Sequence, residues 1–104
     1  MKRVVVRYKV KADRLEEHED LIRKVFAELA TVRPAGLAYS ALKLEDGVSF
    51  VHVATVSTVD GQNPLTALPS FKDFTANITE RCEERAVNSP AAAIGAYRAD
   101  DAPA

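Results

Sequence analysis

Apolar and polar residues alternate strictly over residues 3–11, near the start of the chain. A two-residue period is the pattern of a β-strand with one half-buried face, and the β-branched residues of this segment suit a strand. We predict a strand here whose basic face meets water or an anionic group. The apolar face would carry Val4, Val6, Tyr8 and Val10, and the opposite face Val5, Arg7, Lys9 and Lys11.

The following segment changes to a helical period. Asp13 and Glu16 have the spacing of a capping box, and Pro34 disfavours helical geometry at Arg33. Acidic residues crowd the start and basic residues come later, as the helix dipole prefers. We therefore predict a helix from Asp13 to the residues before Pro34. Its apolar stripe would be Leu15, Ile22, Val25, Phe26 and Leu29.

Segments 37–44 and 48–58 are predicted strands joined by Asp46-Gly47, the preferred composition of a two-residue type I′ turn. That turn places Glu45 opposite Val48, and the register follows by counting outward. The resulting pairs on one face are Lys43 with Phe50, Ala41 with His52, and Tyr39 with Ala54. The opposite face carries Leu42 and Leu44 beside Val51 and Val53.

The strand at 48–58 is apolar on both faces. An antiparallel sheet with one wet face normally alternates apolar and polar residues, and a single layer of helices covers only one face. A second copy of the chain is the economical cover for the other face, so we expect a homodimer through sheet faces. The sequence leaves open which face meets the helices.

Residues 59–69 are rich in turn formers and contain two prolines, which indicates a loop with at most one helical turn. Ser70 and Asp73 have capping-box spacing and open a second predicted helix. Its stripe would be Phe71, Phe74, Ile78 and Cys82. After the polar stretch 83–90 we predict a final strand at 92–98, and we expect 100–104 to be a disordered C-terminal tail.

The order of elements is therefore βαββαβ. It predicts one ferredoxin-like α+β domain over residues 1–99, with a four-stranded antiparallel sheet and two helices on one face. A chain of 104 residues is long enough for one core.

Composition narrows the classes of partner. A net charge of −1 argues against a nucleic-acid partner, and no run approaches the roughly 20 apolar residues of a membrane span. Charged residues interrupt the apolar N-terminal stretch, so we expect no signal peptide and a cytoplasmic location. A single cysteine excludes an internal disulfide and a cysteine zinc cluster.

His52 is the more informative of the two histidines, because the register groups it with Tyr39 and Phe50. If the other face of the first strand packs inward, Arg7 joins Tyr39 and His52. A cation, an imidazole and a phenol around one cavity would suit an anionic or phenolic aromatic ligand, with histidine as a general base. The alternatives are that His52 is a satisfied core or interface residue, and that Arg7 points to solvent.

For the remaining candidates, His18 and Cys82, the sequence favours structural roles over chemical ones. His18 lies on the edge of the first helix stripe with Ile22 at its i+4 position, which gives no metal-ligand pair, and no other spacing resembles a metal site. Cys82 completes an apolar stripe, so we expect a small buried hydrophobe rather than a nucleophile.

Three segments carry a resemblance that spans nearly the whole chain: VVVRYKVKAD at 4–13, GLAYSALKLEDGVSFVHVATV at 36–56, and PSFKDFTANI at 69–78. The pattern resembles the dimeric α/β-barrel superfamily, in particular its antibiotic-biosynthesis-monooxygenase-like branch. The resemblance implies two ferredoxin-like sheets paired face to face. Its members include cofactor-independent oxygenases acting on phenolic or quinol-type polyketides, haem-degrading enzymes and isomerases. Haem degraders use an Asn on strand one, a Trp and a helix-two His, all absent here, which disfavours haem.

The leading hypothesis is a small dimeric enzyme similar to the cofactor-independent monooxygenases, acting on an aromatic, phenolic or quinone-like metabolite with no cofactor. His52 would be the base, Arg7 the anion stabiliser and Tyr39 an orienting partner. The alternative is a non-catalytic small-molecule binding or regulatory dimer. GVSFVHV at 47–53 faintly resembles the third-strand signature of RNA-recognition motifs, but Phe50 is its one aromatic residue, which disfavours RNA binding.

Overall fold

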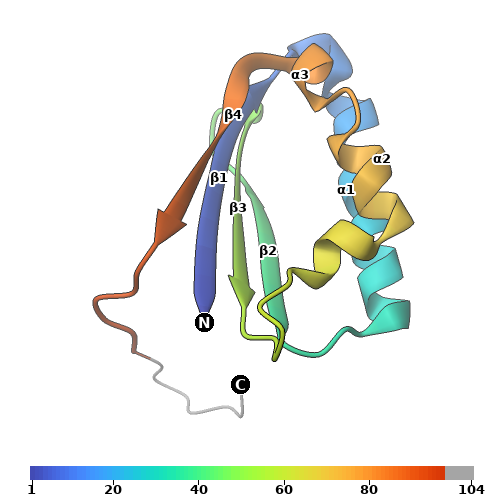
Figure 1. The fold of residues 1–104 in the computed structure, drawn as a ribbon. Coiled ribbons are helices and arrows are strands. Elements are labelled where there is room, and N and C mark those ends of the chain that lie inside the picture. Colours follow the sequence, from blue (N-terminus) through green and yellow to red (C-terminus); the bar gives the residue numbers. More distant parts are fainter. Residues whose placement is uncertain (98–104) are drawn as a thin grey trace.

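The computed structural model describes residues 1–97, which form a four-stranded antiparallel sheet with the helices packed on one face (Figure 1). The strand order is β2-β3-β1-β4. The strands are β1 (Lys2–Val10), β2 (Leu37–Lys43), β3 (Ser49–Val56) and β4 (Cys82–Ala91). The helices are η1 (Ala12–Arg14), α1 (Leu15–Val32), η2 (Pro64–Ala67), α2 (Pro69–Thr75) and α3 (Ile78–Arg81). This is the ferredoxin-like α+β fold expected from the order of elements.

The alternation in β1 has the predicted consequence. Tyr8 and Val10 are buried beneath the helices, while Arg7, one residue away on the opposite face, is exposed. The core lies between the helices and this face of the sheet. Its buried members are Tyr8, Val10, Val25, Phe50, Ala54, Leu65, Leu68, Phe74 and Cys82.

The hairpin register is confirmed, but the predicted turn type is wrong. Tyr39 pairs with Ala54 and Ala41 with His52, as expected. The chain reverses through a turn in which Gly47 N donates to Leu44 O. Among residues 1–97 Asp46 is not one of the non-glycine residues with positive φ, whereas a type I′ turn needs positive φ at both central positions.

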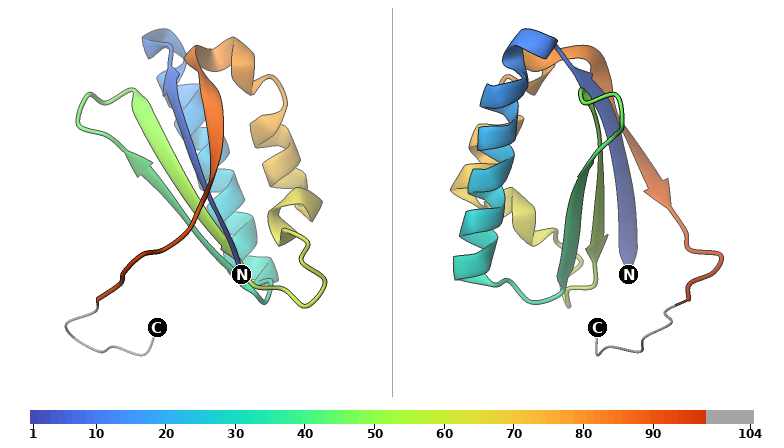
Figure 2. Two further views of the ribbon diagram at one scale, coloured as in Figure 1. Left: turned by 60° about the vertical axis from the view of Figure 1, so that its left-hand side comes forward. Right: turned by 180° about the vertical axis from the view of Figure 1, so that it is seen from behind.

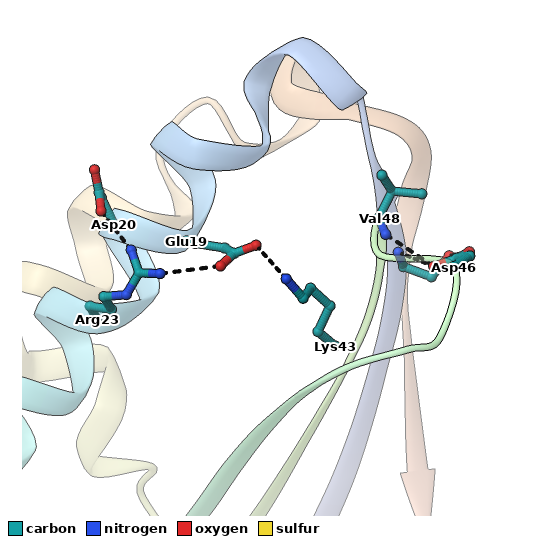
Figure 3. A network of polar contacts seen from close by, with 7 residues as sticks. Glu19, Asp20, Arg23, Lys43, Asp46 and Val48 are labelled. Carbon is teal, nitrogen blue, oxygen red and sulfur yellow. Dashed lines mark hydrogen bonds and ion pairs between the residues drawn. The ribbon is translucent and has the colours of Figure 1, made fainter.

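The predicted register is correct although the turn type is not. The observed loop is longer than the predicted two-residue loop by one residue on each side, so the strand residues stay opposite the same partners. Leu44 N donates to Ser49 O at 2.8 Å and closes the ladder. The Asp46 carboxylate accepts hydrogen bonds from the backbone N–H groups of Val48 and Ser49 and holds the turn (Figure 3). On the same side of the molecule, Lys43 of β2 pairs with Glu19 of α1 at 3.1 Å.

Helix α1 ends where it was predicted to end but starts differently. It stops at Val32, and Arg33 adopts a left-handed conformation just before Pro34. At the start, no capping box with Asp13 forms, since neither η1 nor α1 has a side-chain cap hydrogen bond. Lys11 is instead held extended by a backbone hydrogen bond to Arg81 O, so the chain turns into α1 through a short 3-10 helix.

The predicted second helix is interrupted, and this is the main correction to the fold. Helix α2 ends at Thr75, and Asn77 takes the left-handed conformation with φ 61° before α3 begins. Asparagine tolerates this conformation better than most residues. Cys82 is therefore not a helix residue but the first residue of β4.

The final strand consequently comes earlier than predicted. β4 occupies the stretch 83–90 that we expected to be a polar connection, and 92–97 is not a strand. Its polar composition fits an edge strand, which is exposed along almost all its length. Residue 98 and the expected tail 100–104 lie outside the described residues.

The start of α2 also departs from prediction. Pro69 occupies the first helical position, and the backbone N–H and hydroxyl of Ser70 both donate to the Glu28 carboxylate of α1. The predicted partner, Asp73, is not used. The short turn expected in 59–69 is confirmed as η2.

The opposite face of the sheet is free of helices, as the two further views show (Figure 2). Val51 and Val53 of β3 lie there half-buried, and Leu42 and Val87 are more than half exposed. Within residues 1–97 no helix is long and apolar enough to cross a membrane.

Candidate functional site

A cavity of about 380 Å³ lies between the inner face of the sheet and the segment containing η2, α2 and α3. Most of its wall is apolar, which suits an aromatic or aliphatic ligand. The apolar lining includes Val4, Val6, Ala54, Leu65, Phe71, Phe74 and Ile78. The polar lining includes Tyr8, Tyr39, His52, Asn63, Thr66, Thr75 and Asn88.

Five side chains form a continuous line of hydrogen bonds at this cavity, and we call them the Tyr–His chain: Tyr39, His52, Tyr8, His18 and Arg81. Tyr39 Oη lies 2.6 Å from His52 Nδ1, and His52 Nε2 lies 2.7 Å from Tyr8 Oη. Tyr8 Oη is also 2.6 Å from His18 Nε2. Arg81 Nε donates to His18 Nδ1 at 3.1 Å.

The Tyr–His chain runs from Arg81 in the interior to Tyr39 at the cavity. Arg81, His18, Tyr8 and His52 are each at most 4% exposed, whereas Tyr39 is half-buried. The five residues come from five elements: β1, α1, β2, β3 and α3. The Tyr–His chain therefore connects the sheet to α1 and to α3. Within residues 1–97 no buried side-chain nitrogen or oxygen lacks a hydrogen-bond partner.

Burial sets the protonation states of the chain. It lowers the pKa of both His18 and His52 to about 4, and nearby Arg81 contributes to the lowering at His18. Both imidazoles are therefore neutral near pH 7. Burial likewise raises the pKa of the Tyr8 and Tyr39 hydroxyls well above the ordinary value of tyrosine, so both stay protonated.

Arg81 is a buried cation held by backbone. Its Nη1 and Nη2 donate to the carbonyl groups of Ala76 and Phe74, and its guanidinium lies 5.8 Å from the centre of the Phe74 ring. None of the ion pairs found among residues 1–97 involves Arg81. Burial lowers the pKa of this guanidinium, but an arginine stays protonated in proteins.

The structure brings two of the three predicted site residues together. Tyr39 and His52 are hydrogen-bonded at the cavity, as the hairpin register implied. Arg7 does not join them, because it lies on the outer face opposite Val51 and Val87. The guanidinium linked to the site belongs to Arg81 instead.

The geometry also changes what His52 can do. Both of its ring nitrogens are occupied by tyrosine hydroxyls, so no free nitrogen faces a ligand. Tyr39, which is half-buried and lines the cavity, forms the open end of the Tyr–His chain. The alternative that His52 is a satisfied buried residue is thus correct for its ring, which nevertheless lines the cavity.

Sequence reasoning missed three members of the chain. Tyr8 was placed on the correct face of its strand, but its position beside His52 depends on the β1–β3 pairing, which no local pattern reveals. His18 lies on the predicted helix stripe, where one histidine among apolar neighbours is a weak signal. Arg81 was not predicted, because the second predicted helix runs through Asn77 without a break.

Asn63 is a further residue that the sequence reasoning did not select. It lines the cavity, and its Oδ1 accepts a hydrogen bond from Leu65 N at 3.0 Å. The amide NH₂ is then the group that Asn63 offers to a ligand.

Other candidates have structural roles. Cys82 is buried in the core, and burial raises the pKa of its thiol, as expected of a packed rather than reactive cysteine. Residues 1–97 contain no group of three or more His, Cys, Asp or Glu placed to hold a metal ion.

Comparison with known proteins supports the fold. No protein-family model matches the chain, and no curated protein is similar in sequence. Among solved structures, an antibiotic-biosynthesis-monooxygenase-type protein from Nitrosomonas europaea superposes with a TM-score of 0.72 at 15% identity, covering 89% of each chain.

Two more solved structures show the same likeness. A protein of this type from Caulobacter crescentus has a TM-score of 0.67 at 23% identity over 90% of each chain. SnoaB, a cofactor-independent oxygenase from Streptomyces nogalater, has a TM-score of 0.67 at 20% identity over 91% of this chain and 94% of its own. The chain therefore has the ferredoxin-like fold of the antibiotic biosynthesis monooxygenases.

Proposed function

We propose that this protein is a cofactor-independent monooxygenase of an aromatic, phenolic or quinone-like small molecule, bound in the cavity beside Tyr39. The observation that carries the proposal is the hydrogen-bonded pair of Tyr39 and His52 at the edge of a largely apolar cavity of about 380 Å³. An aromatic body fits the apolar wall, and an oxygen substituent fits the Tyr39 hydroxyl and the Asn63 amide. The fold shared with SnoaB agrees with this chemistry.

The reaction needs only the substrate and dioxygen. Loss of a proton from a phenol with an activated CH₂ group gives an enolate or phenolate, which passes electrons to dioxygen and forms a carbon–oxygen bond. The resulting hydroperoxide loses water and leaves a carbonyl group. The carbon atom thus exchanges its two hydrogens for one oxygen, and the second oxygen atom leaves in water.

The residues contribute by binding and by stabilising charge. The Tyr39 hydroxyl donates to the oxygen that becomes negative, in an apolar site where such a hydrogen bond is stronger than in water. Because both nitrogens of His52 are engaged, His52 acts through Tyr39 as a positioning residue. The proton that the substrate loses goes to solvent.

Oxygen uptake with a panel of hydroxylated anthrones, which carry the activated CH₂ group, tests the proposal. The protein should consume one dioxygen per substrate, and isotopically labelled dioxygen should leave one labelled atom in the product. Tyr39→Phe should lower kcat by about 10²- to 10³-fold, the usual cost of one oxyanion donor. Tyr97→Phe, at a site that is 90% exposed, is the matched control and should behave as the parent.

The second candidate function is a non-catalytic small-molecule binding or regulatory module. It is favoured by the full engagement of His52, which leaves no free base in the cavity. This function predicts that the same phenols raise the melting temperature without any oxygen consumption. Saturable binding, no uptake and no effect of Tyr39→Phe beyond affinity would replace the oxygenase proposal by this one.

We further propose that the functional unit is a homodimer formed through the outer sheet face. Leu42 is exposed beside the half-buried valines of β3, and Val87 is exposed on β4, with Arg7 of β1 between Val87 and Val51. These exposed apolar side chains support this proposal, since helices cover only the other face.

A further inference from the structure

Every hydrogen bond in the Tyr–His chain has a direction, and Arg81 is where that direction begins. A guanidinium only donates hydrogen bonds, so the nitrogen that it meets, His18 Nδ1, must accept. A neutral His18 then carries its hydrogen on Nε2 and donates to Tyr8 Oη, 2.6 Å away.

The same logic passes along the next two residues. Tyr8 has one hydroxyl hydrogen, and because it already accepts from His18 it donates to His52 Nε2. His52 therefore holds its hydrogen on Nδ1 and donates to Tyr39 Oη at 2.6 Å. The hydroxyl hydrogen of Tyr39 has no acceptor within the chain and is left for the cavity.

We propose that Arg81 is a positioning residue that fixes this direction, so that Tyr39 always donates into the cavity and holds the ligand through an anionic oxygen, a phenolate or enolate. This inference rests on the proposed ligand site and deepens it. In the opposite direction Tyr39 would donate to His52 and accept a hydrogen bond from the ligand, and this would put a hydrogen on His18 Nδ1 facing the Arg81 N–H group.

Arg81 is well placed to act in this way. It is 2% exposed, and its two other contacts are carbonyl groups at the end of α2, which keep its Nε aimed at His18. It has no carboxylate partner among the ion pairs of residues 1–97, and Glu17 is a carboxylate that acts on its charge from a greater distance. Hydrogen bonds in a chain polarise one another in a medium of low dielectric, which carries part of this charge toward Tyr39.

The direct test is the tautomer of each histidine, read from imidazole ¹⁵N chemical shifts near neutral pH. The two histidines should be opposite tautomers: His18 protonated on Nε2 and His52 protonated on Nδ1. Any other pair in the parent protein would overturn the proposal. This measurement needs neither a substrate nor activity, so it stands or falls separately from the proposed function.

Variants show whether Arg81 is the cause. Arg81→Met removes every donor and should let both histidines populate both tautomers, whereas Arg81→Lys keeps a cation that only donates and should retain the parent pattern. Arg23→Met, on the exposed surface of α1, is the control. Parent tautomers in Arg81→Met would contradict the inference. Should Arg81→Met not fold, the comparison of Arg81→Lys with the parent replaces it, and a changed pattern there would contradict the donor role.

The ligand half of the proposal has its own probe, 4-nitrophenol, whose anion absorbs visible light. Bound beside a fixed donor, it should ionise at a lower pH than in solution, by about one unit, and Tyr39→Phe should abolish the shift. Failure to bind, or binding as the neutral phenol, would contradict anion binding while leaving the tautomer result unaffected.

Discussion

The buried, neutral imidazoles of His18 and His52 in the Tyr–His chain make the stability of this protein depend on pH. Burial lowers the pKa of His18 and His52 from 6.5 to about 4, so between these values the unfolded chain binds protons that the folded chain does not. The free energy of unfolding should be highest above pH 6.5 and fall as the pH is lowered toward 4. The total loss should be on the order of several kcal/mol.

Urea denaturation at a series of pH values measures this loss. The carboxyl groups of Glu17 and Glu28 have lowered pKa values from hydrogen bonds to Arg14 and Ser70, and their contribution is lost only below about pH 4.5. The slope above that pH therefore reports the histidines. His52→Gln should roughly halve it, and a stability that is flat from pH 6.5 to 4.5 would contradict the assignment.

At the scale of residues, the sequence predicted those site residues whose positions depend on the hairpin register alone. The Asp46-Gly47 hairpin pairs Ala41 with His52 and brings Tyr39 to the same face, so two of the site residues could be predicted. Tyr8 and Arg81 reach His18 only through the tertiary packing of β1 and α3 against α1. Local periodicity carries no information about such contacts.

At the scale of elements, the break between α2 and α3 places Arg81. Asn77 has φ 61°, and after this kink α3 supplies Arg81, whose guanidinium reaches back to the carbonyl groups of Phe74 and Ala76. A helix continued through this point would project position 81 in a different direction. The kink is therefore part of how the chain holds its buried cation.

The left-handed conformation of Asn77 gives a prediction about stability. Asn77→Gly should change the free energy of unfolding little, whereas Asn77→Val should lower it by about 1–2 kcal/mol, the cost of this conformation for an ordinary L-residue. Thr79→Val, at an exposed position in α3, controls for adding apolar surface. Midpoints of urea unfolding with unchanged slope measure the effect, and equal midpoints for Asn77→Val and Thr79→Val would contradict it.

The errors in predicting elements have one physical origin. The helical stripe through Phe74, Ile78 and Cys82 is real in the sense that all three side chains pack toward the core. An interrupted helix followed by an edge strand satisfies the same burial as one longer helix does. Burial alone could not place the end of the helix, and the polar composition of β4 concealed an edge strand.

At the scale of the whole molecule, the two faces of the sheet are in different states. The inner face is closed by helices, whereas the outer face exposes 52% of Leu42 and 62% of Val87 on either side of the valines of β3. Apolar residues on an exposed sheet face are typical of interaction surfaces, which agrees with the proposed dimer. Arg7 stands within this face and is better placed to contact a partner than to contact the cavity.

Disruption of that face tests the proposed dimer. Val53→Glu would place a charge in the centre of the outer face, where desolvation in a dimer would be costly, so the variant should be monomeric by light scattering at micromolar concentration. Its midpoint of thermal unfolding should lose the concentration dependence that a parent dimer shows. Val59→Glu makes the same change at a fully exposed loop position and should remain dimeric. A monomeric parent, or a dimeric Val53→Glu, would mean that the outer face is not the interface. If a monomeric Val53→Glu variant keeps the opposite histidine tautomers, then a single subunit forms the Tyr–His chain without a partner.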